Sequence, residues 1–198
     1  EWGFTKDAAC YNARKCRERL LVEEPYLEER LLRYVLRPFE VRWCYYSAVR
    51  PLWNSPRPSL YKNCVIPNRF LVSRPAGVAK PEGVPFYMSS TLGDFDFVKG
   101  HSYHFPVLLN TSRILDQVLP GLSEKHHVIA NLSDTARKYL ASLGLPDPDT
   151  DQAIAELIWM HALAIGYSPA YLKENADGIR QDWPRIPLPA DKEVLLAS

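Results

Sequence analysis

The spacing of hydrophobic and polar positions changes twice along the chain, which divides the sequence into three segments. Residues 5–36 have a helical period. Thr5 can cap a first helix, and Pro25 suits the first turn of a second one, where its missing N–H costs nothing. The apolar side chains at positions 27, 31 and 35 would share the inner face of this second helix. The first segment is therefore predicted to be helical.

The second segment, residues 37–109, has the pattern of short strands separated by proline-rich turns. Runs of strand-forming residues lie at 41–46, 68–73, 84–89, 95–98 and 103–109. Seven prolines between positions 51 and 85 interrupt them, and each lacks the N–H that a central strand would donate. This pattern predicts a curved, mostly antiparallel sheet with long connecting loops, which are where recognition residues usually lie.

The third segment returns to a helical period from about residue 132. Ser133 can cap a helix that ends before Gly144, residues 154–165 have a clear amphipathic repeat, and Ser168-Pro169 opens a further helix. Farther on, the prolines of Arg185–Pro189 fix an extended backbone, which we interpret as a structural strap packed on the helices. His161, on the apolar face of its helix, is interpreted as a core histidine.

Together the segments predict an α+β fold with a short N-terminal helical piece, a curved mostly antiparallel sheet with long Pro-rich loops, and a C-terminal helical bundle. The corresponding division is a helical connector at 1–36, a β-rich domain at 37–125 and a helical subdomain at 126–198.

Composition narrows the class of protein. The chain has 198 residues, of which 46% are hydrophobic and 24% charged, a balance typical of globular domains rather than disordered chains. No apolar run approaches the roughly 18 residues of a membrane span. The four cysteines form no C-x-x-C pair, which favours free thiols in a reducing, cytoplasmic compartment over a disulfide or a metal site. Without a leader or an initial Met, the sequence is expected to be a fragment of a longer polypeptide.

The net charge of +1 conceals a strongly basic stretch. Residues 37–80 carry eight basic side chains against Glu40 alone, whereas residues 81–198 are net acidic. Such an excess indicates an anionic partner, although a solvated sheet face with its counter-charges elsewhere in the fold would have the same composition.

The residue types in this stretch favour nucleic acid. Arginine forms bidentate hydrogen bonds with guanine edges and phosphates, and asparagine can read adenine edges. The candidates for base reading are Arg57, Arg69, Arg74, Asn54, Asn63 and Asn68. The candidates for phosphate contacts are Arg50, Lys62 and Lys80. For each arginine the alternative is a surface ion pair.

Signatures of catalysis are largely missing from the sequence. It contains no G-x-S-x-G, H-E-x-x-H, P-loop or G-x-G-x-x-G motif. Asp94-x-Asp96 followed by Lys99 is a weak nuclease-like pattern that needs a third acid, and His101 and His104 could touch a ligand. We expect no catalytic residue and no metal site in this chain.

Six short motifs follow one another along the chain. The first is Tyr34–Tyr46 (YVLRPFEVRWCYY). The others are Ser55–Pro58, Asn68–Arg74, Tyr103–Leu109, Tyr167–Leu172 and Asp182–Pro189. They span more than three quarters of the chain, and in this order they resemble the C-terminal specificity region of Type ISP restriction-modification enzymes and related N6-adenine DNA methyltransferases. The first motif is similar to the family's Y-R-P-F-D-x-R-W-x-Y-Y, with Glu40 in place of the usual Asp.

The resemblance implies a target recognition domain for double-stranded DNA, followed by helices, in a bacterial phage-defence enzyme. Adenine methyltransferases hold the flipped base with an N/D-P-P-Y/F tetrapeptide, and neither this motif nor a glycine-rich turn for S-adenosylmethionine occurs here. S-adenosylmethionine and catalysis are therefore expected in an upstream methyltransferase domain of the same polypeptide, which would be a partner of this chain.

Two other functions compete with DNA recognition. The chain could be a protein-interaction or structural module of a larger DNA-modifying enzyme, with the basic stretch only a solvated face. It could also be a self-contained nuclease or hydrolase. Binding that weakens steeply with salt would favour DNA recognition, and metal-dependent cleavage would favour a nuclease.

Overall fold

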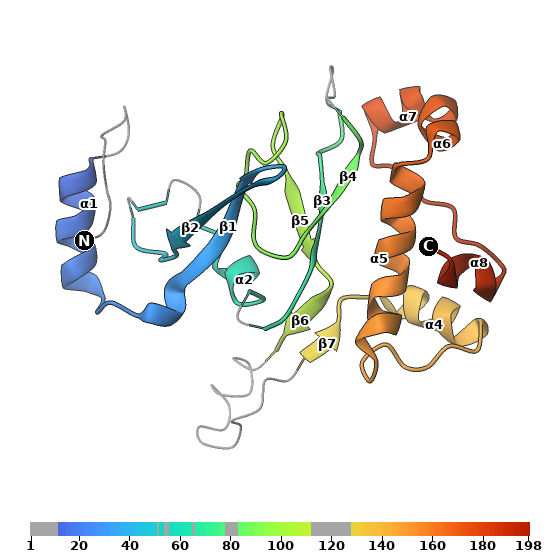
Figure 1. Ribbon diagram of the computed structural model, residues 1–198, viewed down its shortest axis with the longest axis horizontal. Coiled ribbons are helices and arrows are strands. Elements are labelled where there is room, and N and C mark those ends of the chain that lie inside the picture. Colours follow the sequence, from blue (N-terminus) through green and yellow to red (C-terminus); the bar gives the residue numbers. More distant parts are fainter. Residues whose placement is uncertain (1–11, 51, 54–55, 65, 78–82, 112–127) are drawn as a thin grey trace.

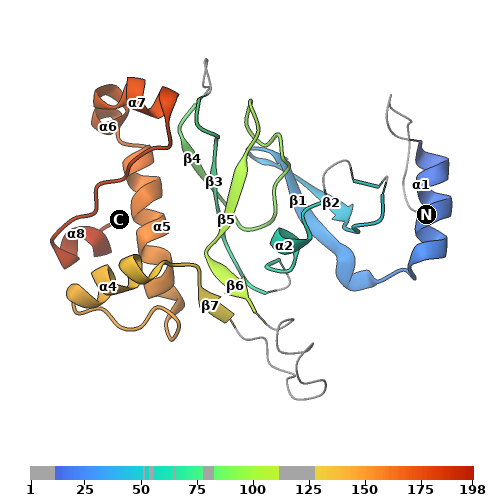
Figure 2. The ribbon, with the colours of Figure 1, turned by 180° about the vertical axis from the view of Figure 1, so that it is seen from behind.

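The computed structural model describes residues 12–50, 52–53, 56–64, 66–77, 83–111 and 128–198, and it has the predicted α+β fold. An N-terminal helix, small antiparallel sheets and a helical C-terminal part follow one another along the chain, and the strands lie between the two helical parts (Figure 1). The view from behind shows the same order of layers (Figure 2).

The N-terminal segment is only partly helical, so one prediction is wrong. Helix α1 spans Ala13–Glu23 and is capped by Asn12, whose side chain accepts a hydrogen bond from the N–H of Lys15 at 2.8 Å. The predicted second helix is replaced by a short 3₁₀ turn, η1 (Glu28–Arg30), and by strand β1 (Leu31–Arg37). The predicted cap Thr5 lies outside the described residues.

Strand β1 exists because it pairs with β2 (Glu40–Tyr45) in an antiparallel hairpin. Tyr34 and Leu32 on one face pack with Tyr46 and Leu92 in a buried cluster. Apolar residues four positions apart, as at 27, 31 and 35, are compatible with a helix. The hydrogen bonds to β2 and the packing of Tyr34 and Leu32 in this cluster stabilise a strand instead. Local periodicity does not contain that information.

The described strands form three small sheets rather than one curved sheet. The hairpin β1–β2 is the first. In the second, β3 (Phe70–Ser73) lies between β4 (Phe86–Ser89) and β5 (Tyr103–Pro106), and all pairs are antiparallel. The third pairs β6 (Leu108–Asn110) with β7 (Val128–Ala130), a strand that the pattern did not predict.

A short helix and a turn complete the β-rich part. Helix α2 spans Pro58–Tyr61 and begins with a proline at its first position. Residues 95–98, which were predicted as a strand, form a turn instead, and the N–H of Phe97 donates to the carbonyl of Asp94 at 3.1 Å. A parallel bridge between Val35 and Gly93 fastens this connection to strand β1.

The C-terminal helices follow the prediction closely. Helix α4 (Asp134–Ser142) is capped by Ser133, and Gly144 beyond its end has a φ of 68°. The remaining helices are α5 (Gln152–Gly166), α6 (Pro169–Glu174), α7 (Ala176–Gln181) and α8 (Lys192–Leu196). Leu71, Phe86 and Ala162 form a buried cluster that joins helix α5 to strands β3 and β4.

The segment 185–189 lies across the helices as an extended strap. Its carbonyls accept hydrogen bonds from Tyr171 at Arg185 (3.0 Å) and from Tyr139 at Pro189 (2.8 Å). His161 is 4% exposed, and its ring nitrogens contact Pro187 O and Ser198 Oγ. The strap and the core histidine are thus confirmed, although Leu188 remains 43% exposed.

The cysteines and helices also bear on the class of protein. Among the described residues, Cys16, Cys44 and Cys64 are free thiols, and Cys10 lies outside the described part. Burial raises the pKa of both Cys44 and Cys64 to about 12, which keeps these thiols protonated and unreactive. None of the helices in the described part of the chain is long and apolar enough to cross a membrane.

Candidate nucleic-acid interface

The basic stretch does not form one continuous positive face, because several of its side chains have internal partners. Arg37 approaches Asp94 at 3.8 Å, Arg42 pairs with Glu40 at 2.9 Å, and Arg69 pairs with Glu156 of helix α5 at 2.9 Å. Two of these carboxylates come from outside the stretch. The counter-charges elsewhere in the fold thus account for part of the local excess.

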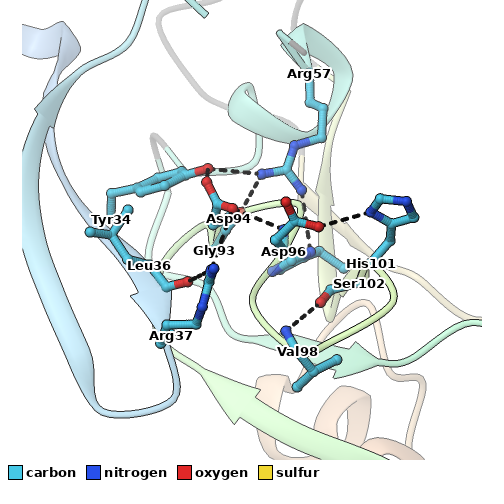
Figure 3. A network of polar contacts seen from close by, with 11 residues as sticks. Tyr34, Leu36, Arg37, Arg57, Gly93, Asp94, Asp96, Val98, His101 and Ser102 are labelled. Atoms are coloured by element: carbon cyan, nitrogen blue, oxygen red, sulfur yellow. Dashed lines mark hydrogen bonds and ion pairs between the residues drawn. The ribbon is translucent and has the colours of Figure 1, made fainter. Parts of the chain in front are cut away.

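Arg57 is directed into the molecule rather than toward solvent. Its guanidinium donates to the carbonyl of Gly93 and to the hydroxyl of Tyr34 (3.3 Å), and it contacts Nδ1 of His104 at 3.3 Å (Figure 3). Its backbone N–H donates to the hydroxyl of Tyr46. Arg57 thereby ties the segment before α2 to the hairpin and to strand β5.

The same network fixes the connection between β4 and β5. The hydroxyl of Tyr34 donates to Asp94 at 3.2 Å, and burial raises the pKa of that hydroxyl. Asp94 also accepts from the N–H of Asp96, and Asp96 contacts the ring of His101 at 2.8 Å (Figure 3). Burial and the charge of Arg57 lower the pKa of His104 to about 3, so this histidine is neutral. These contacts fasten the turn over residues 91–102 to the hairpin and to itself.

Asn63 and Asn68 use their amides inside the fold. Asn68 Nδ2 donates to Leu108 O at 2.8 Å and to Asn63 O at 3.1 Å, while its Oδ1 accepts from the N–H groups of Leu108 and Arg69. Asn63 Oδ1 accepts from the N–H of Asn110 at 2.8 Å. All four hydrogen-bonding positions of the Asn68 amide are occupied, so in this conformation it presents none to DNA.

The other base-reading candidates differ in accessibility. Arg74 is 6% exposed, and Nη1 lies 3.5 Å from the carbonyl of Gly83; burial lowers its pKa, yet a guanidinium stays charged. The side chain of Arg69 is 48% exposed beside Glu156, so it can leave that ion pair. Asn54 lies outside the described residues. DNA contact by these six candidates stays a prediction.

Two of the three phosphate candidates can be placed. Arg50 is exposed in the turn that follows β2, and Lys62 is half-buried at the end of α2. Lys80 lies outside the described residues. Among the members of the predicted set that the structure describes, Arg50 and Arg69 are therefore the most accessible.

Sequence reasoning did not select the arginines of the hairpin. Arg33, Arg37 and Arg42 are all exposed, and Arg33 was assigned to a helix. The hairpin turn lies close to the β4–β5 connection, and the Arg37–Asp94 pair joins them (Figures 1 and 2). Recognising Arg33 and Trp43 as cross-strand neighbours would have revealed this surface.

The weak nuclease-like pattern has a structural use instead. Asp94 is engaged with Tyr34 and Arg37, and Asp96 with His101. Within the described ranges, no three His, Cys, Asp or Glu side chains are placed to hold a metal ion.

Comparison with known proteins places this geometry in a family context. The family model described as "Type ISP C-terminal specificity domain" matches residues 5–197. No curated protein matches the chain. Nine solved chains match it.

One similar structure is a DrdV–DNA complex solved by electron cryomicroscopy, with 22% identity and a TM-score of 0.63 over 88% of this chain. Another is the ATP-dependent Type ISP restriction-modification enzyme LlaBIII bound to DNA, with 17% identity and a TM-score of 0.59 over 94% of the chain. These matches cover 16% and 11% of the two solved chains, so this chain corresponds to a small part of each. At such identities the likeness establishes the shared fold.

Proposed function

The chain belongs to the family of Type ISP C-terminal specificity domains, and we propose that it recognises a specific sequence in double-stranded DNA on behalf of a longer restriction-modification polypeptide. The observation that carries this proposal is the family match over residues 5–197, almost the whole chain. The DNA complexes among the similar structures support it, as do the exposed arginines of the hairpin, Arg33, Arg37 and Arg42.

Catalysis would belong to another part of that polypeptide. We propose that a methyltransferase domain outside residues 1–198 binds S-adenosylmethionine and methylates adenine at N6, because the sequence of this chain contains no N/D-P-P-Y/F motif. The chain's own task is to hold and orient the duplex, and we place this activity in the bacterial cytoplasm.

The described residues suggest a division of labour within the chain. One group of side chains forms hydrogen bonds with backbone groups inside the protein and so fixes the conformation of the loops. Its members are Arg57, Asn63, Asn68 and Arg74. Arg50 and Arg69 remain accessible and would contact DNA directly. A guanidinium that contacts a phosphate raises affinity for all sequences, whereas one that contacts a base edge selects a sequence.

Exchange of the whole region between two family members tests the proposal directly. Residues 5–197 would be transferred into a relative that methylates a different sequence, and the methylated sites would be mapped in a host genome. The proposal expects the methylated sequence to follow residues 5–197. If an active chimera kept the recipient's original sequence, specificity would lie elsewhere.

Salt dependence separates DNA recognition from a purely structural role. The affinity of the full-length protein for a labelled duplex would be measured by fluorescence anisotropy at several salt concentrations. Each phosphate contact contributes about −0.9 to the slope of log K against log salt, so Arg50→Ala should flatten the slope by about one unit. Affinity that is independent of salt would favour a protein-interaction module.

A further inference from the structure

The most exposed aromatic side chain of the described residues lies at the tip of the β1–β2 hairpin. Phe39 is 98% exposed, and together with Pro38 it forms the turn between the two strands. Full exposure of a phenylalanine removes the usual reason for its presence, which is burial. Its position at the hairpin turn leaves the ring available to a binding partner.

The backbone of Phe39 adds a second, independent observation. Its φ is 68°, in the left-handed region that glycine and asparagine occupy readily and a bulky residue does not. A turn selected only for stability would hold glycine here. An exposed ring on a strained backbone position therefore indicates a function for the side chain.

The charges beside the tip identify the chemistry of the partner. Arg37 precedes the tip with 56% of its side chain exposed, and Arg42 follows it with 67% exposed. Arg33 lies over the exposed ring of Trp43, with its guanidinium carbon 5.0 Å from the ring centroid. The only acid of the hairpin, Glu40, is held by Arg42 at 2.9 Å. An apolar apex flanked by arginines is complementary to a polyanion that also presents apolar surfaces.

Double-stranded DNA has both properties, and we propose that the β1–β2 hairpin enters the duplex tip first, with Phe39 acting as a wedge between neighbouring base pairs and Arg37 and Arg42 contacting the flanking phosphates. Phenylalanine and proline are among the side chains that DNA-bending proteins insert between base steps. The tip carries no polar side chain that could read a base edge, which favours stacking over hydrogen-bonded readout. This inference rests on the proposed function.

The structure keeps such a hairpin stiff. The N–H of Val35 donates to Leu92 O at 3.1 Å, and the N–H of Asp94 donates to Val35 O at 2.7 Å. Val35 is also buried against Val72 and Phe97. Because the strand just before the tip is anchored in this way, insertion of the ring costs little additional ordering.

Glycine at position 39 tests the wedge without endangering the fold. Phe39→Gly removes the ring and suits the positive φ, so the melting temperature should stay the same or rise. Phe39→Leu keeps an apolar wedge and is the conservative variant. Val194→Ala removes an apolar side chain of helix α8 that is 52% exposed, and it serves as the control for general loss of surface.

The probe is a duplex selected by the full-length protein from a random pool, with 2-aminopurine at successive positions. Wild-type protein should raise the 2-aminopurine fluorescence at one base step, because unstacking relieves quenching. Phe39→Gly should abolish that rise and weaken binding about tenfold, the size expected for one base–aromatic stack. Phe39→Leu should retain most of the fluorescence rise and most of the affinity, and Val194→Ala should leave both unchanged.

Other outcomes overturn the proposal in distinguishable ways. Unchanged affinity and fluorescence in Phe39→Gly would refute the wedge and leave DNA recognition standing. A lower melting temperature of the full-length Phe39→Gly protein, with DNA binding unchanged, would show that the ring packs on another protein domain. Failure of the wild-type protein to bind any duplex would remove the proposed function and the wedge together.

Discussion

Replacement of Arg57 by alanine should destabilise the chain substantially, because this side chain joins three segments that are distant in the sequence. Its guanidinium contacts Gly93 O, the Tyr34 hydroxyl and His104 Nδ1. A hydrogen bond that involves a charged group contributes about 1.5–3 kcal/mol, and a buried carbonyl left without its donor adds a desolvation cost. Since Tyr34 keeps Asp94 as a partner, we expect a net loss of about 2–4 kcal/mol.

Chemical denaturation of the chain measures this loss. Trp53 packs on Tyr34 with ring centroids 5.1 Å apart and donates to the carbonyl of Tyr45, so its fluorescence reports on the surroundings of Arg57. Arg57→Ala should shift the midpoint to lower denaturant at an unchanged slope. Arg57→Lys keeps the charge but not the fork of donors and should recover only part of the loss.

The matched control is Arg50→Ala, which removes an exposed arginine of the same basic stretch and should change the unfolding free energy by less than about 0.5 kcal/mol. A directly base-reading Arg57 predicts the opposite pattern. In that case Arg57→Ala would unfold at the wild-type midpoint, and the methylated sequence would become degenerate at one base pair. Such a result would refute the structural role derived from the contacts.

Two further predictions concern the same network. Gly93→Ala should cost about 1–3 kcal/mol, because a Cβ there would meet the buried ring of His104 and lie 3.1 Å from Phe97; Gly178→Ala, with open space around it in helix α7, should be neutral or stabilising in the same denaturation assay. The free energy of unfolding should also decrease as the pH is lowered from about 6.5 to 3. The folded-state pKa of His104 is lowered to about 3, so below pH 6.5 the unfolded chain binds a proton that the folded chain does not. The slope for this group approaches about 1.4 kcal/mol per pH unit, and His104→Asn should show a shallower dependence in parallel titrations; equal slopes would contradict the assignment.

The helical half of the fold was predictable because its signals are local. Ser133 and Ser168 each accept a hydrogen bond from the first turn of the helix that they precede, as predicted, and Asp151, which was not selected as a cap, does the same for helix α5. The end of helix α4 is a local signal as well, because Gly144 just beyond it adopts the positive φ that glycine tolerates. These cap hydrogen bonds join residues only two or three positions apart, so a short window of sequence contains both partners.

The first strand and the sheet divisions were not predictable in this way. The run Leu31–Arg37 has apolar residues on both faces, so helical and extended readings fit it equally well. Its pairing with Glu40–Tyr45 and the bridge to Gly93 decide for the strand. The separation of the strands into three sheets likewise depends on connections that no local period records.

The candidate readers illustrate a second limit. Asn68 follows a proline and precedes a strand, which is a common setting for a recognition residue, but its amide exchanges two hydrogen bonds with the backbone of Leu108, 40 residues away. Arg57 and Arg74 are similarly drawn inward by carbonyls at 93 and 83. Residue type identified polar groups with strong hydrogen-bonding capacity, but only the fold decides whether that capacity is used inside the protein or offered to DNA.

Because Arg57, Asn68 and Arg74 form their hydrogen bonds inside the protein, the surface expected to contact DNA is defined by the fold and not by one continuous stretch of sequence. Side chains that satisfy buried carbonyls cannot leave them for DNA without the desolvation cost that makes Arg57 stabilising. Among the described residues of the basic stretch and the hairpin, the arginines that remain exposed are those of the hairpin, Arg50 and Arg69. Because Asp94 contacts both Arg37 and the hydroxyl that Arg57 supports, movement of the buried network would also move the hairpin. Substitutions at Arg57 should therefore weaken DNA binding for all sequences alike, through the position of the hairpin, whereas substitutions at an exposed base-reading arginine should change which sequence is bound.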